Sequence, residues 1–193
     1  MEKLDRSSLW SLEQYSEARQ AFRAQVIAHK KPRRVAIGRH ATLIFEDALT
    51  MKYQIQEMLR IEKIFEAAEI DEELAAYNPL IPDGGNWKAT LMIEYPDVEE
   101  RQRALATMGG IEDTIWVQAE GAAKVYAIAN EDMERSTDGK AAAVHFLRFE
   151  LDPASVTAIK AGAPIKAGID HDALREEVQL NPATIASLSE DLD

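Results

Sequence analysis

The sequence contains no cysteine among its 193 residues, and this absence removes several kinds of chemistry at once. Without thiols, the chain forms no disulfide, holds no cysteine-ligated iron–sulfur cluster or thiolate zinc site, and has no thiol nucleophile. It also lacks a long apolar run, whereas a membrane-spanning helix needs about 20 consecutive apolar residues. The first residues carry no apolar signal core. We therefore expect a soluble, cytoplasmic protein.

Positive charge is also scarce, with 22 Lys and Arg residues against 34 Asp and Glu residues and a net charge of −12. Such a surface repels nucleic acids and anionic membranes at long range. The one basic cluster, 29–34, has no interleaved aromatic residues, and cations at this place suit the negative end of a helix dipole. We therefore expect neither nucleic acid nor a membrane as a partner.

The sequence motifs typical of common cofactor-binding sites are missing as well. Gly84 and Gly85 do not have the spacing of a dinucleotide-binding loop, and no Lys-Ser/Thr pair follows them as in a P-loop. The sequence has no HExxH or Glu-x-x-His pair, and its four histidines are scattered. No cofactor is therefore evident, and any metal site would have to gather ligands from distant segments.

The first part of the chain alternates between helical and strand periodicity. Ser11 and Gln14 form a capping box ahead of a helix that should end near Lys30, because Pro32 cannot continue it. Alternating apolar residues over 33–46 predict a β-hairpin, and the pattern over 47–68 predicts a broad, deeply buried helix. Asp71 is a candidate cap for a further short helix that ends before Asn78.

The second part is richer in strands. The patterns predict, in order, a strand over 89–95, a helix over 97–109, strands over 115–118, 125–128 and 142–151, a helix starting at 152–153, and a strand over 165–169. This β-α-β-β-β-α-β order is close to the ferredoxin-like plan with one additional strand. We therefore predict an α+β fold in one domain, residues 1–193, with a helix-rich part (1–80), a sheet part (88–172) and a C-terminal helix (181–193).

Three groups of residues are candidates for a functional site, and the first lies on the central helix. Tyr53 and Glu57 are neighbours one turn apart, with Arg60 following, and Glu62 falls on the apolar face. A carboxylate buried there needs a partner or a shifted pKa. Glu62 is thus either half of a structural ion pair, with Arg148 or Arg34, or a pocket carboxylate that acts as a base or ligand.

The second group is the loop that contains Asp83, Asn86 and Trp87, around two adjacent glycines. These residues suit a binding loop, since glycines permit close approach and Trp offers a flat wall, but they also suit a tight turn anchored by a core Trp. The third group is His145 and Arg148, which alternation places on opposite faces of a strand. His145 is either a satisfied core histidine or, with Glu62 and Arg148, part of an acid/base or anion-holding site.

Several segments also resemble a known family. They are Val26–Lys31, Gly38–Asp47, Gln54–Glu62, Tyr77–Gly84, His145–Leu151 and Gly168–His171. Nearly the full chain resembles a bacterial family of uncharacterised proteins, a domain of unknown function. Genes of that family often neighbour genes for rubrerythrin-like di-iron proteins and iron–sulfur oxidoreductases. The resemblance implies an accessory role in a redox or peroxide-handling system and supplies no catalytic residues.

Three functional hypotheses follow. The first is a protein without redox chemistry of its own that binds a ligand or a redox partner, either rubrerythrin-like or an iron–sulfur oxidoreductase. The second is a small enzyme or metal-binding protein that uses Glu57, Glu62, His145 and Arg148 between the central helix and the sheet, with the loop 83–87 as a wall. The third is a homodimer in which N-terminal helices pack across a two-fold axis.

Overall fold

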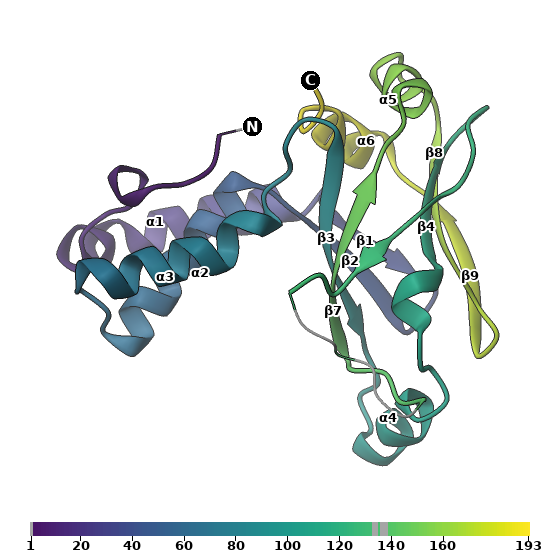
Figure 1. Ribbon diagram of the computed structural model, residues 1–193, viewed down its shortest axis with the longest axis horizontal. Helices are drawn as coiled ribbons and strands as arrows, with labels where there is room; N and C mark the ends of the chain where they lie inside the picture. The colour runs from purple at the N-terminus through teal and green to yellow at the C-terminus, as the bar shows by residue number, and fades with distance from the viewer. Residues whose placement is uncertain (1, 133–134, 136–138) are drawn as a thin grey trace.

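Helices and two antiparallel sheets make up the fold in the computed structural model, which describes residues 2–132, 135 and 139–193 (Figure 1). The predicted α+β class is confirmed. The helices α1–α3 lie side by side and extend away from the sheets, while the remaining helices lie at the ends of the strands. We call α1–α3 the helical arm.

The helical arm follows the local signals of the sequence with two exceptions, the unbroken helix over 47–68 and the cap at Asp71, which lies inside a helix. A short 3-10 helix, η1 (Arg6–Ser8), precedes α1 (Leu12–Lys30), which begins with the predicted capping box. α2 (Ala48–Glu62) ends where Lys63 adopts a left-handed conformation, at φ 57°. α3 (Ala67–Tyr77) then starts four residues before Asp71 and runs into the 3-10 turn η2 (Asn78–Leu80). The predicted continuous helix over 47–68 is therefore two helices joined by a sharp turn.

The first sheet has the strand order β1-β2-β3-β7-β6. Its strands are β1 (Arg34–Ile37), β2 (Ala41–Glu46), β3 (Asn86–Ile93), β7 (Val144–Glu150) and β6 (Ile128–Ala129). The predicted hairpin over 33–46 is confirmed as β1 and β2, which turn at Gly38. Buried residues alternate along β3 and β7, so one face of this sheet belongs to the core and the other faces the arm.

The second sheet has the order β5-β4-β8-β9. It comprises β5 (Val125–Tyr126), β4 (Ile115–Ala119), β8 (Ile165–His171) and β9 (Leu174–Gln179); the flanking helices are α4 (Val98–Leu105), η3 (Ile111–Thr114), α5 (Pro153–Lys160) and α6 (Pro182–Ser189). The ferredoxin-like order is not confirmed, because β3 and β7 pair in one sheet while β4 and β8 pair in the other. The single strand expected over 125–128 likewise divides between the two sheets.

The main core fills the space between the sheets. Phe45, Trp87 and Phe149 contribute from the first sheet, and Val117 and Ile169 from the second, all 0–1% exposed. Fully burying one such side chain contributes roughly 1.5–3 kcal/mol. Two smaller clusters hold the helical arm together, one between α1 and α2 and one between α2 and α3.

The segment that comprises η2 and the loop after it contacts both ends of the chain. The Asn78 side chain exchanges hydrogen bonds with the backbone of Leu4, both at 2.8 Å, and Lys3 donates to the Asn78 and Ile81 carbonyl oxygens. At the other end, the Asp193 amide donates to the Gly84 carbonyl oxygen at 3.0 Å. The irregular loop thus fixes the N-terminal segment and the C-terminus at one end of the molecule.

Candidate functional site

Glu57 connects two helices of the arm and does not face the sheets. Its carboxylate accepts hydrogen bonds from the Tyr15 hydroxyl at 2.6 Å and from Arg19 Nε and Nη2 at 2.7 and 2.9 Å. Arg60 Nη2 adds a longer contact of 3.4 Å. The Arg19 guanidinium, assisted by the Tyr15 hydroxyl, lowers the pKa of Glu57 to about 2. This carboxylate is therefore a link between α1 and α2 that is charged at neutral pH.

Glu62 and Tyr53, the other candidates on α2, lie elsewhere. Tyr53 packs its ring against Phe22, 5.9 Å between centroids. Glu62 is the last residue of α2 and is exposed, and its neighbours Ile61 and Phe65 are 61% and 71% exposed. The prediction that Glu62 is buried among apolar side chains is wrong, because α2 has extended beyond the sheets at this end (Figure 1).

The loop 83–87 is a structured turn whose aromatic residue belongs to the core. Trp87 is fully buried, donates from Nε1 to the Leu188 carbonyl oxygen at 2.9 Å, and meets Phe45 edge-on. Asn86 accepts from the Asp83 amide, and the Asp83 side chain accepts from the Gly85 amide. Of the two interpretations of this loop, the geometry matches the tight turn anchored by Trp87.

His145 is a core histidine with its ring nitrogens engaged. It is 0% exposed; its Nε2 lies 3.0 Å from the Ala142 carbonyl oxygen and its Nδ1 lies 3.1 Å from Asn130 Nδ2. Glu112 Oε1 is 3.8 Å from Nδ1. Burial lowers the pKa of His145, which favours the neutral ring. This geometry fits a ring that donates to Ala142 and accepts from Asn130.

Arg148 lies on the opposite face of the same strand. Its Nε and Nη2 donate to both oxygens of Glu131 at 2.9 and 2.8 Å, and Nη1 donates to Glu150. The expected pairing of Glu62 with Arg148 is therefore absent, and Arg34 pairs with Glu94. The four residues of the enzyme hypothesis lie in separate surroundings, although their individual roles stay predictions.

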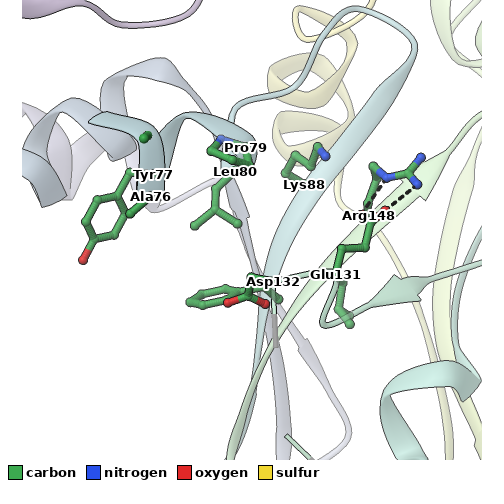
Figure 2. A pocket seen from close by; sticks show the side chains of 11 residues that line it. Ala76, Tyr77, Pro79, Leu80, Lys88, Glu131, Asp132 and Arg148 are labelled. Carbon is green, nitrogen blue, oxygen red and sulfur yellow. Dashed lines mark hydrogen bonds and ion pairs between the residues drawn. The ribbon is translucent and has the colours of Figure 1, made fainter. Parts of the chain in front are cut away.

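A cavity of about 410 Å³ lies between the C-terminal end of α3, with η2, and the outer face of the first sheet. Its apolar wall comes from α3, η2 and β7 and includes Ala76, Tyr77, Leu80 and Phe146. In Figure 2, Leu80 lies between Tyr77 on one side and the polar residues Lys88 and Arg148 on the other. One side of the cavity is therefore apolar, and the other is lined by the charged residues Lys88, Glu131 and Arg148.

Lys88 also lines this cavity, and Arg148 is the cavity residue that the sequence pattern indicated. In the β3–β7 pairing Lys88 lies directly opposite Arg148, and its other cross-strand neighbour is Glu46 of β2. Glu46 is engaged elsewhere, accepting from Thr90 Oγ1 at 2.9 Å and lying 3.8 Å from Lys30 Nζ. Within residues 2–132, 135 and 139–193, Lys88 makes no hydrogen bond or ion pair through its ammonium group. Burial, followed by the charge of Arg148, lowers its pKa.

A signal for Lys88 existed in the sequence but was incomplete. The strand predicted from the pattern begins at Ala89, so Lys88 lies just outside it, whereas β3 begins at Asn86. Once Trp87 and Ala89 are assigned to the core face, alternation places Lys88 on the other face with Thr90. Its pairing with Arg148 depends on strand register and has no signature in the local sequence.

Among residues 2–132, 135 and 139–193, no three or more His, Asp or Glu side chains are grouped so as to hold a metal ion. In the same residues, no helix is long and apolar enough to span a membrane.

The fold and site define an α+β protein with two antiparallel sheets, a helical arm and a cavity between the arm and the first sheet. A family model described as Protein of unknown function (DUF3501) matches residues 3–192, and the chain belongs to that family. It is also similar to a crystal structure described as a novel protein of unknown function from Burkholderia pseudomallei K96243. The two chains are 51% identical over 100% of each, with a TM-score of 0.95. No curated protein matches.

Proposed function

We propose that this protein binds a small organic molecule in the cavity between the helical arm and the first sheet. The ligand has an apolar body that contacts Tyr77, Leu80 and Phe146, and an oxygen-bearing head group that contacts Lys88. A cavity of about 410 Å³ lies within the range of small-molecule sites, about 300–1,000 Å³.

The observation that carries this proposal is the cross-strand pair of Lys88 and Arg148. Two cations directly opposite each other on one sheet face are destabilising, and a half-buried ammonium group without a partner adds a desolvation cost. Glu131 and Glu150 satisfy Arg148, whereas Lys88 makes no such contact among the described residues. A ligand oxygen at Lys88 would offset this cost, and the apolar wall would bind the rest of the molecule.

The test uses p-isopropylbenzoate, an aromatic acid with an apolar end, titrated into the full chain by calorimetry. We expect saturable binding that weakens about tenfold in Lys88→Met, equivalent to about 1.4 kcal/mol. The matched control is Lys166→Met, since Lys166 lies on the second sheet and pairs with Glu177. No saturable binding by the wild type, or equal binding by Lys88→Met, would overturn the proposal.

A role beside a redox protein rests on the family resemblance alone and stays a proposal, as do the cytoplasmic location and the homodimer. The net charge of −12 suits electrostatic docking to a basic partner surface. Affinity capture from the native host should recover a rubrerythrin-like protein or an iron–sulfur oxidoreductase. Repeated capture of neither would contradict this role, and light scattering measures the oligomeric state.

A further inference from the structure

We propose that Lys88 is a nucleophile that forms a reversible imine with an aldehyde or ketone bound in the cavity. This inference rests on the proposed function and narrows the ligand to a carbonyl compound with an apolar body.

The first support is the rigid placement of the Lys88 backbone. Lys88 lies between Trp87 and Ala89, whose side chains are 0% and 2% exposed in the core, so alternation directs Lys88 to the opposite face. Its strand is paired on both sides, with β2 and with β7. The amine therefore extends from a fixed point at the edge of the cavity (Figure 2).

The second support is that Lys88 lacks the kind of partner that holds the amino groups of several other lysines. Lys124 and Lys166 are committed to Asp170 and Glu177, each at 2.8 Å, and Lys3 donates to two carbonyl oxygens. An amino group held in this way would have to leave its partner before its nitrogen could attack a carbonyl carbon. Lys88 lines a cavity with an apolar wall and makes no such contact to any residue that the structure describes.

Lys52 provides the informative contrast. It lies over the Trp10 ring, 4.1 Å from the centroid, and burial lowers its pKa as well. It does not line the cavity beside the first sheet. Reactivity that followed only from burial would therefore appear at both lysines, whereas a site built for a carbonyl ligand would react at Lys88 alone.

The surroundings of Lys88 lower its pKa, chiefly through burial. Burial and the opposed Arg148 favour the uncharged amine, which is the nucleophilic form, while the charges of Glu131 and Asp83 act in the other direction. Glu131 and Glu150 hold the Arg148 guanidinium in place. A lysine next to another cation in an apolar pocket is an established arrangement for imine formation.

The chemistry needs no oxidant and no cofactor. The neutral amine nitrogen attacks the carbonyl carbon, and proton transfer from nitrogen to oxygen gives a carbinolamine. Its hydroxyl group takes up a proton and leaves as water, and the nitrogen lone pair forms the carbon–nitrogen double bond of a protonated imine. Addition of water reverses these steps and releases the carbonyl compound and the amine.

The experiment traps this imine in the full-length chain. The protein is incubated with p-isopropylbenzaldehyde, reduced with borohydride, digested, and mapped by mass spectrometry. We expect at least tenfold more adduct at Lys88 than at Lys52. Lys88→Arg, which keeps the charge but cannot form an imine, should lose the dominant adduct, while Lys52→Arg should keep it.

The outcomes separate this inference from the proposed function. If the wild type binds p-isopropylbenzoate and Lys88 gains no more adduct than Lys52, the imine is wrong and the binding site stands. If neither the acid nor the aldehyde binds saturably, both proposals fail. Thermal unfolding of Lys88→Arg at the wild-type temperature shows that a lost adduct does not result from misfolding.

Discussion

At the scale of single residues, buried and half-buried charges in this protein fall into two groups. Glu57, Arg148 and Arg33 each have several partners of opposite charge or matching polarity, so each is held in its charged form. Lys88 differs because no described group meets its ammonium. Removing one partner from a compensated buried charge is costly, whereas the charge of Lys88 is the one that the proposed ligand would compensate.

The first prediction concerns Glu57→Gln. The substitution removes a charged acceptor of Tyr15 and Arg19, and hydrogen bonds to charged groups contribute about 1.5–3 kcal/mol. We expect a loss of about 1–3 kcal/mol in unfolding free energy at neutral pH. Glu13→Gln, on the exposed side of α1, is the control and should change little.

The pH dependence of this loss has a defined sign. The pKa of Glu57 falls from 4.5 to about 2 on folding, so its contribution is complete above about pH 5 and declines as the pH falls toward 2. Urea titrations at neutral pH and near pH 3 measure the difference between Glu57→Gln and the wild type. A difference that stayed constant or grew in acid would contradict this account of Glu57.

At the scale of elements, a buried ion pair attaches the segment just after α6 to the residue just before β1. Arg33 and Asp191 are 1% and 3% exposed, and Arg33 Nη2 lies 2.5 Å from Asp191 Oδ2. Arg33 also donates to the Phe45 carbonyl oxygen and lies 3.5 Å from Asp47. Burial raises the pKa of Asp191 to about 6 even with this partner present.

The second prediction is that Arg33→Met destabilises the protein by about 3–5 kcal/mol, because it leaves two buried carboxylates without their guanidinium. The pKa of Asp191 would rise further, so the folded variant would bind more protons than the unfolded chain. Stability of Arg33→Met should therefore recover partly as the pH falls from 7 to 5. Arg34→Met, at an exposed pair, is the matched control and should cost little. Equal stability of the two variants at pH 7 would refute the role of this pair.

Local rules predicted the starts of several helices well and the pairing of strands poorly. Ser11, Asp97, Asp152 and Asn181 cap the helices that they were expected to begin, because capping needs only residues within one turn. The division into two sheets depends on pairings far apart in sequence. β9 was missed because Arg175, Glu176 and Glu177 leave it exposed and without alternation.

The candidate site was also hard to predict from local sequence patterns. The apolar periodicity of 47–68 placed Glu62 in the core, but the helix ends at that residue and the arm extends beyond the sheets there. The sequence indicated Arg148 and its face of the strand, while its opposition to Lys88 required the register of β3 and β7. Cross-strand neighbours that lie 60 residues apart leave no local pattern in one sequence.

At the scale of the whole molecule, the three hydrophobic clusters described above must unfold together if the chain is a single domain. The main core lies between the sheets, and the two smaller clusters lie within the helical arm. Polar links join them: Arg33 connects the turn after α1 to α6, and His29 meets Asp47 at the start of α2. The loop 78–87 adds contacts to both ends of the chain.

The third prediction is that these links make unfolding cooperative over residues 1–193. Far-ultraviolet circular dichroism, dominated by the helices, and Trp fluorescence should report one coincident transition in urea. Trp87 and Trp116 lie in the sheets and Trp10 in the arm, so Trp10→Phe confines the fluorescence signal to the sheets. If that signal and the helical signal then separate, the arm is an independent unit, and the cavity between arm and sheet would open whenever the arm unfolds alone.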